Sequence, residues 1–235
     1  QAQAQTQAQA QTQQTQAEQE HYRAQRVKAM MRKNSVECTV HAIANAESYA
    51  IDLFWDLVAR FTHCDLPRLF YDDMVFIAGQ EAEHFLSWHC RLIELGTPFG
   101  TFPISRGLWQ SAGETSGDLF ARLAIINLTH EAKGLDTYPR TRQKFAQSRD
   151  FPSVAILDHN IQEEVLHVAA GVRWFKYLCE REGLGAVATF HRLSRVYFRG
   201  FLREPFNRAD RDRAGLTQDW YMPLTAPPAP PCSPL

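Results

Sequence analysis

The sequence predicts an all-α fold of two helical hairpins joined by a long crossover, plus an extra C-terminal helix. Apolar residues recur at spacings of three and four along most of the chain. No segment shows the sustained alternation of apolar and polar residues that is typical of strands. The 235 residues, of which 45% are hydrophobic, are enough for one well-buried domain.

The first hairpin is bounded by recognisable start and stop residues. Asn34 and Glu37 have the spacing of a capping box, which opens a first helix that runs to about Phe61. Pro67 lies where a second helix begins, because proline is tolerated in the first turn, and Gly96 closes this helix. These two helices are the first predicted hairpin.

The second hairpin follows a segment rich in Gly, Pro, Ser and Thr, residues 97–117, which we expect to be the long crossover. A third helix is predicted over about 118–137. Pro152 opens a fourth helix that ends at Gly183, and a fifth covers about 185–202.

The two ends of the chain differ in composition from the helical bundle predicted for residues 34–222. Residues 1–33 are a low-complexity Gln/Ala/Thr leader with a basic run at its end. We expect most of it to be disordered, because it offers too little apolar surface to offset the entropy of ordering. Residues 223–235 form a proline-rich tail, expected to be extended. The sequence begins at Gln1 rather than Met, which fits a targeting segment that was removed or left out.

Charge and cysteine content limit the partners and the cellular compartment that we expect. A net charge of −1 provides no general attraction to nucleic acid or to anionic membranes. The longest apolar runs, such as MVFIAG, are too short to cross a bilayer, so no membrane association is expected. The five cysteines are scattered and form no CxxC motif, which favours a reducing compartment, the cytoplasm.

Six acidic or imidazole side chains interrupt the apolar stripes of the first four helices. The second and fourth helices each carry a Glu-x-x-His pair inside the stripe, and the first and third each carry one glutamate. The six residues are Glu47, Glu81, His84, Glu131, Glu164 and His167. The lone glutamate precedes its Glu-x-x-His by 34 residues in the first hairpin and by 33 in the second. Two hairpins of matched length therefore carry matched polar positions.

Four carboxylates in one apolar interior would repel one another, and isolated buried charges cost several kcal/mol each. Two divalent cations would neutralise them, and the histidines would add neutral nitrogen ligands. One Glu from each of two helices and Glu-x-x-His from each of the other two is the pattern of ferritin-like di-iron or di-manganese bundles. The predicted cofactor is two Fe ions, with Mn as the alternative. The competing interpretation is a set of ordinary core or surface polar residues.

Five stretches also resemble a known family. They are HAIANAESYAIDLFWDLVARF, EAEHFLSWHCRLIELG, HEAKGLD, EEVLHVAAGVRWFKYLC and PFNRADRDRAGLTQDWY. Together they are similar to the ferritin-like family of unknown function called DUF455, over about residues 35–224 and without the leader. The resemblance implies a ferritin-like bundle in which the six residues match metal-ligand positions. It implies no settled activity.

Three functions of different classes are consistent with these residues. The first is an oxidoreductase that activates O2 to oxidise or hydroxylate an unknown substrate. In it Glu47 and Glu131 would bridge the metals or change position during the reaction, and His84 and His167 would each hold one metal. The second is metal handling: ferroxidase, storage or peroxide scavenging. The third is a metal-free helical scaffold. A storage cage suits a chain with a long leader, tail and crossover poorly, and a scaffold does not need all six ligands. The oxidoreductase is therefore preferred.

Neighbouring residues have weaker predicted roles. Glu163 lies beside the fourth stripe and is expected to be solvated. His130 is expected to support a neighbouring ligand or to be structural, rather than to be a ligand itself. The crossover aromatics Phe99, Phe102 and Trp109 could cover a substrate pocket.

A basic stripe raises the question of a nucleic-acid partner. Similar bundles include a tRNA-hydroxylating family, so such a stripe beside a di-metal site would suit an RNA or phosphorylated substrate. A solvated face paired with Glu204, Asp210 and Asp212 is the favoured explanation, since no RNA-binding signature accompanies it. The arginines predicted on one face of the fifth helix are Arg192, Arg195, Arg199 and Arg203, with Arg208, Arg211 and Arg213 after them.

Overall fold

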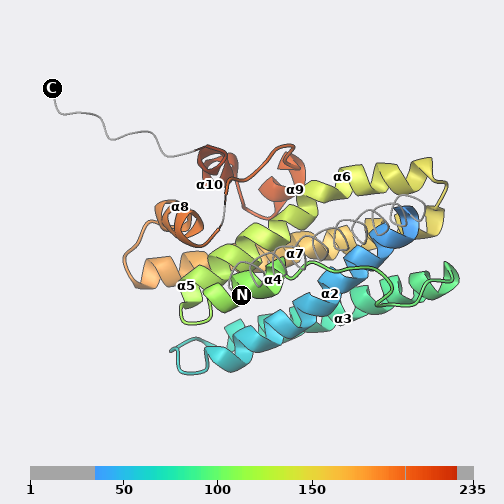
Figure 1. The fold of residues 1–235 in the computed structure, drawn as a ribbon. Helices are drawn as coiled ribbons and strands as arrows, with labels where there is room; N and C mark the ends of the chain where they lie inside the picture. The colour runs from blue at the N-terminus through green and yellow to red at the C-terminus, as the bar shows by residue number, and fades with distance from the viewer. Residues whose placement is uncertain (1–34, 199, 227–235) are drawn as a thin grey trace, which may run out of the picture.

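The computed structural model describes residues 35–198 and 200–226, and these residues form helices with no strand among them (Figure 1). The all-α prediction is confirmed. The leader, Asn34 of the predicted capping box, Arg199 and residues 227–235 of the tail lie outside the described residues. The helices are α2 (Ser35–Arg60), α3 (Arg68–Glu94), α4 (Gly107–Glu114), α5 (Leu119–Arg122), the π-helix η1 (Leu123–His130), α6 (Glu131–Gln147), α7 (Phe151–Arg181), α8 (Ala186–Tyr197), α9 (Arg208–Arg213), α10 (Gln218–Tyr221) and the 3-10 helix η2 (Met222–Leu224).

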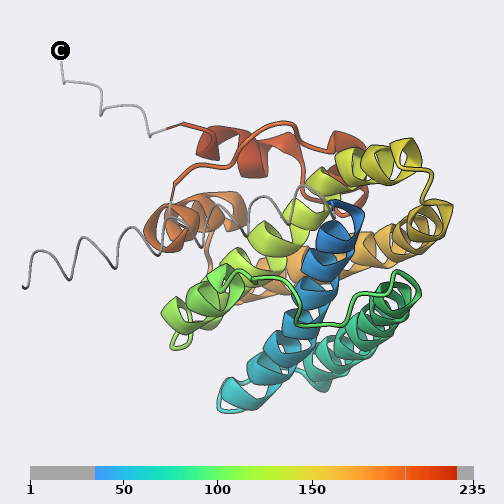
Figure 2. The same ribbon diagram turned by 45° about the vertical axis from the view of Figure 1, so that its right-hand side comes forward.

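The long helices form two antiparallel pairs. α2 packs along α3, and the continuous run of α5, η1 and α6 packs along α7 (Figure 1). α3 also contacts α7, which joins the two pairs. The crossover with α4 passes over α2 on its way from α3 to α5 (Figure 2). None of the described helices is both long and apolar enough to cross a bilayer.

Helix boundaries in the two hairpins follow the predicted residues. Pro67 is the N-cap of α3, and Pro152 lies in the first turn of α7. The Asp150 side chain caps α7 by accepting a hydrogen bond from the Ser153 amide. Gly96 and Gly183 follow the two helices with φ of 70° and 66°, a left-handed conformation that favours glycine.

The third predicted helix, 118–137, differs from the structure in length and in type. Residues 123–130 are wound as a π-helix, and α6 then continues to Gln147. Pro139 lies inside α6 and has no N–H to donate to the Leu135 carbonyl, the usual reason for a helix to stop. Here the Asn207 side-chain amide donates to that carbonyl at 3.1 Å, so the helix continues through the proline.

The fifth predicted helix, 185–202, is too long. α8 ends at Tyr197, so Arg203 lies beyond the helix, while Arg192 and Arg195 are exposed on it. The prediction of a basic stripe along one face of the fifth helix is therefore wrong. Arg199 lies outside the described residues.

The arginines that follow α8 have structural partners. Arg211 is 2% exposed, lies over the Tyr221 ring, and donates to both carboxylate oxygens of Asp136 at 2.8 and 2.6 Å. Arg213 pairs with Asp210 at 2.8 Å, as the solvated-face interpretation expected. The helical period did not reveal the short C-terminal helices. Through Asn207 and Arg211 they bind Leu135 and Asp136 of α6, one turn beyond Glu131, and we call these contacts the clamp.

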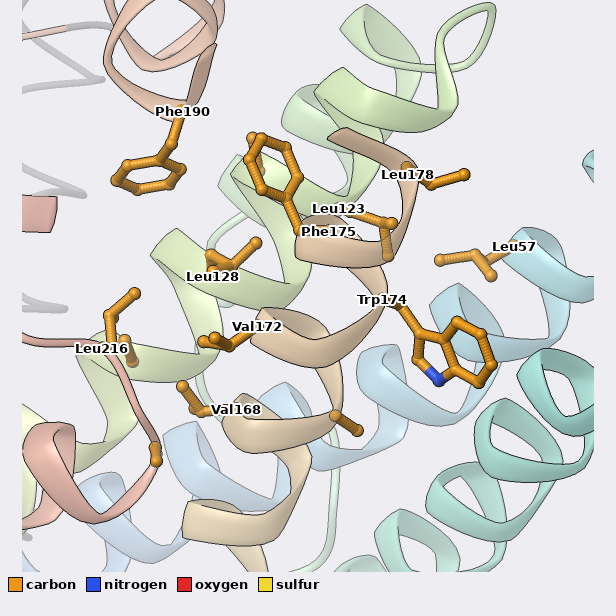
Figure 3. Packing of buried hydrophobic residues seen from close by; sticks show 14 of the residues in the cluster. Leu57, Leu123, Leu128, Val168, Val172, Trp174, Phe175, Leu178, Phe190 and Leu216 are labelled. Atoms are coloured by element: carbon orange, nitrogen blue, oxygen red, sulfur yellow. The ribbon is translucent and has the colours of Figure 1, made fainter. Parts of the chain in front are cut away.

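The apolar core of the described residues consists of one large and one smaller cluster, and Leu53, Ala112 and Ile126 form a third cluster of three residues. The large one surrounds the C-terminal half of α7, where it meets η1, α8 and the C-terminal segment (Figure 3). Gly171 brings α7 close to η1, since a Cβ there would lie 3.0 Å from the Asn127 Cβ. The smaller cluster lies near the start of α2 and includes Trp88 and Phe145. On α2 and α3 the polar residues of the stripes fall between these two clusters. Figure 3 labels Leu57, Leu123, Leu128, Val168, Val172, Trp174, Phe175, Leu178, Phe190 and Leu216 of the large cluster.

Candidate metal centre

All six residues singled out in the stripes meet inside the helix pairs. α2 and α6 contribute one glutamate each, and α3 and α7 contribute the two Glu-x-x-His pairs. Glu81, His84 and His167 are no more than 1% exposed. The other three, Glu47, Glu131 and Glu164, are partly exposed by the criterion of whole-residue exposure.

The six side chains form two overlapping groups of four. In the first, one ligand atom from each of Glu47, Glu81, His84 and Glu164 lies within 4.8 Å of the others. In the second, the same holds for Glu81, Glu131, Glu164 and His167. Each group could hold one metal ion. Glu81 and Glu164 belong to both groups, whereas the bridging position was expected for the lone glutamates, Glu47 and Glu131. The carboxylates of the Glu-x-x-His pairs are central because α3 and α7 contact each other directly.

His84 is held with one nitrogen toward the cluster and the other away from it. Its Nε2 lies 2.7 Å from Glu163 Oε2 and donates a hydrogen bond to it. Its Nδ1 lies 3.3 Å from Glu164 Oε1 and 3.7 Å from Glu81 Oε2. The expectation that Glu163 is solvated is therefore wrong: its carboxylate orients the imidazole.

His167 repeats this arrangement on the opposite helix. Its Nε2 donates to Gln80 Oε1 at 3.0 Å, and its Nδ1 lies 2.9 Å from Glu81 Oε1. Gln80 and Glu163 each precede the glutamate of a Glu-x-x-His pair, and each holds the histidine of the other helix. Neither role was predicted from the sequence, although a polar residue directly before the glutamate of both motifs was a visible signal.

Four cluster atoms have no hydrogen bond within the described part of the chain. They are both carboxylate oxygens of Glu81 and the Nδ1 atoms of His84 and His167. They lie at ion-pair distances from one another but are not aligned for hydrogen bonds. Buried polar atoms are nearly always satisfied, so a group of converging unsatisfied ones needs an explanation. A bound cation provides one, because carboxylate oxygens and imidazole nitrogens are ligands for Fe, Mn and Zn.

Burial and neighbouring charges shift the pKa values of the glutamates in the cluster. Burial, followed by the charges of Glu81 and Glu164, raises the pKa of Glu47 and of Glu131 well above the usual 4.5. Burial would also raise the pKa of Glu81, but the close polar and charge interactions with His167 and His84 outweigh it and lower the value to about 2.

The histidines shift in the opposite direction to that expected from burial alone. Burial lowers the pKa of His84, but its interactions with Glu164 and Glu81 raise it to about 11. The pKa of His167 is also raised, through Glu81 and Glu164, against the effect of burial. These shifts favour the protonated forms of both imidazoles, of Glu47 and of Glu131 in the metal-free cluster.

The π-helix η1 sets the direction of Glu131, the residue that follows it. A π turn contains an extra residue, which rotates the following side chains relative to the preceding α-helix. The Thr129 hydroxyl donates to the Ala124 carbonyl, five residues back, at 2.8 Å. His130, predicted to be structural, contacts Ser111 at 3.0 Å, and burial lowers its pKa to about 4.

A cavity of about 600 Å³ reaches the cluster from one side. Glu47, Glu131 and Glu164 form part of its wall, which is otherwise built mainly by α2, α6 and α7. The crossover contributes Leu108 from α4.

The predicted aromatic cover belongs elsewhere. Phe102 is buried against the His41 ring, and Trp109 packs edge-on against Tyr49. Phe99 stacks on the His41 ring, and none of the three aromatics is among the residues that line the cavity. The crossover thus borders the cavity through an aliphatic side chain.

Comparison with known proteins shows which family the chain resembles in sequence. A family model described as "Protein of unknown function (DUF455)" matches residues 1–222. Because that match begins at residue 1, the expectation that the leader falls outside the family is wrong. An "Uncharacterized protein" of Haemophilus influenzae is 35% identical over 190 residues, 77% of this chain. The chain covers 66% of that relative, slightly less than two thirds of its length. No solved structure matches.

Proposed function

This chain belongs to the DUF455 family of proteins of unknown function, and from that premise we propose that it is a ferritin-like di-iron oxidoreductase. Its substrate would be oxidised or hydroxylated with O2. Manganese is the alternative metal, because it accepts the same carboxylate and imidazole ligands.

The order of the ligands along the chain supports the ferritin-like part of the proposal. Two antiparallel helix pairs each present a lone glutamate and then Glu-x-x-His, which is the arrangement of di-iron carboxylate bundles. The lone glutamates lie on α2 and α6, and the pairs lie on α3 and α7.

The observation that carries the proposal is the pair of overlapping groups. Glu47 and His84 would hold one ion, Glu131 and His167 the other, and Glu81 and Glu164 would lie between the two. Two divalent ions would balance four carboxylates, which removes the cost of burying those charges together. They would also satisfy the four unbonded atoms of the cluster.

When bound, two ferrous ions supply the two electrons needed to reduce O2 as one oxygen atom enters the substrate and the other leaves as water; an external reductant then restores them. The chain's own residues prepare the site for this chemistry. Glu163 and Gln80 fix the imidazoles so that Nδ1 points inward. Apolar clusters on both sides keep water from the metals, and the cavity admits substrate on the side of the lone glutamates.

Two other functions fit less well. Ferroxidase or storage activity needs an iron path but no cavity of the size that holds a small organic molecule. A metal-free scaffold has no use for converging unsatisfied polar atoms, which cost stability. An RNA-linked substrate has lost its main support, because α8 ends at Tyr197 and no stripe from Arg192 to Arg203 lies on one helix. Arg211 and Arg213 are engaged in structural pairs.

The test is the metal content and oxygen consumption of the full chain. After anaerobic reconstitution with Fe(II) and removal of free metal, mass spectrometry should find about two iron ions per chain. On exposure to air, O2 should be consumed in proportion to the bound iron. Glu81→Ala combined with Glu164→Ala should abolish both results. Glu83→Ala, on the exposed side of α3, should change neither. An iron-free wild type would contradict the proposal, and iron bound without O2 consumption would favour a non-oxidative role.

A further inference from the structure

The cavity beside the cluster is long and follows two helices. Its lining extends along α6 from Glu131 to Lys144 and along α2 from Ser35 to beyond Glu47. Thirteen residues separate Glu131 from Lys144, which at 1.5 Å per residue corresponds to roughly 20 Å. One end therefore touches the cluster, and the other lies where α2 begins.

The middle of the cavity is open and apolar. Small residues leave the space open, and aliphatic side chains form its walls. On α2, Ala42, Ala46 and Ala50 recur every four residues and so share one face, and Gly134 lines the cavity from α6. Ile43, Leu157 and Ile161 supply aliphatic walls. A narrow aliphatic chain would match this surface, whereas a polar molecule would lose hydrogen bonds with water.

The far end of the cavity is cationic. Lys144 and Arg140 line it, and no ion pair among the described residues includes either of them. Lys144 is half-buried, and its ammonium donates to the Ser35 carbonyl at 2.9 Å and to the Thr39 hydroxyl. These partners are neutral, and among the residues that the structure describes no carboxylate pairs with Lys144. A partly buried cation without a carboxylate favours an anionic ligand, which a charge-assisted hydrogen bond would hold.

We propose that this cavity binds an elongated amphiphile whose anionic head lies at Lys144 and Arg140 and whose alkyl chain runs along the alanine face to the cluster. The head is a carboxylate or a phosphate, since both suit an ammonium and a guanidinium. The idea that this amphiphile is the substrate rests on the proposed function. In that case the end of the alkyl chain near Glu47 and Glu131 is the part that is oxidised. As a binding site it does not require metal.

Calorimetry on the metal-free full-length protein tests the binding directly. Dodecanoic acid, dodecyl phosphate and dodecanol share one alkyl chain and differ in the head. We expect the two anions to bind at least about tenfold more tightly than the alcohol. The stronger of the two anions identifies the head group. Equal affinity for all three, or no binding, would overturn the proposal.

Two variants locate the ligand. Lys144→Met keeps the length of the side chain and should lower the affinity for the anions about tenfold without affecting dodecanol. Ala46→Phe fills the alanine face and should abolish binding of all three. Arg142→Met is the control, because Arg142 is exposed on α6, pairs with Asp158 and does not line the cavity. Unchanged binding in Ala46→Phe would place the ligand elsewhere and contradict the proposal.

The outcome stays informative if a variant is unstable. Lys144 also holds the start of α2 through its hydrogen bond to Ser35, so circular dichroism checks the fold of each variant. The comparison of the three head groups needs only the wild-type protein. Iron content is measured separately. Amphiphile binding without iron binding would refute the proposed function alone, whereas iron binding without amphiphile binding would refute this inference alone.

Discussion

The two halves of the centre present the same ligands but support them differently. The α2–α3 half holds Glu47 on an uninterrupted α-helix, whereas the other half places Glu131 directly after a π-helix. His84 donates to a carboxylate, that of Glu163, and His167 donates to the neutral amide of Gln80. A matched set of candidate ligands would therefore not make two matched metal positions, because the residues behind these side chains set how firmly each one is held.

The largest expected effect tests whether the halves share their central carboxylates. Glu81→Ala should remove both ions, because Glu81 belongs to both groups, while Glu47→Ala should remove only one. Iron content after Fe(II) reconstitution would fall from about two per chain to none in the first variant and to about one in the second. Retention of about one ion in Glu81→Ala would show that the two positions do not share Glu81. Glu83→Ala serves as the exposed control.

The second prediction concerns the clamp that only the Glu131 half possesses. Arg211→Met leaves the carboxylate of Asp136 largely buried without its partner, which should cost about 3 kcal/mol in urea unfolding. Because the clamp acts on α6 one turn beyond Glu131, the position that includes Glu131 should also lose iron first. Arg208→Met, an exposed neighbour, should change unfolding by less than about 0.5 kcal/mol. A stable Arg211→Met protein would mean that the clamp is dispensable.

The third prediction sharpens the difference between Glu163 and Gln80. A carboxylate acceptor makes the His84 imidazole a stronger donor to metal than an amide does. Titration with Co(II) should therefore show two unequal binding steps. Glu163→Gln should weaken the tighter step about tenfold and bring the two steps together. Gln80→Glu should strengthen the weaker step. Two equal steps in wild type would contradict this difference between the halves.

The smallest effect concerns pH and the metal-free protein. The pKa of His84 rises from 6.5 to about 11 in the folded state, so its stabilising contribution is complete below pH 6.5 and is lost toward pH 11. The raised pKa values of Glu47 and Glu131 have the same sign: the folded state favours their protonated forms, and stability falls as pH rises above 4.5. Glu81, with a pKa lowered to about 2, contributes stability above pH 4.5 that is lost only in acid.

The melting temperature of the metal-free protein should therefore fall between pH 6 and pH 9, by an amount that calorimetry can measure. The iron-loaded protein should show less of this fall, because cations replace the protons on His84, Glu47 and Glu131 and metal binding strengthens as pH rises. A metal-free protein whose stability increases over this range would contradict the charge assignment of the cluster.

Much of the fold was predictable because helix periodicity and end signals are local. Pro67, Gly96, Pro152 and Gly183 mark helix ends in both the prediction and the structure. The prediction failed where a distant residue changes the local rule. Pro139 should end a helix, but Asn207, far along the chain, supplies the missing donor to the preceding turn.

The sequence by itself determined which six residues could meet, because spacings of three and four place Glu81 with His84, and Glu164 with His167, on one helix face. Only the tertiary structure decided that Glu81 and Glu164 are central, that Glu163 and Gln80 hold the histidines across the interface, and that an alanine-lined cavity ends at the cluster. The physical reason is range. Helical period is a property of neighbouring residues, whereas the contact between α3 and α7 depends on how whole helices pack.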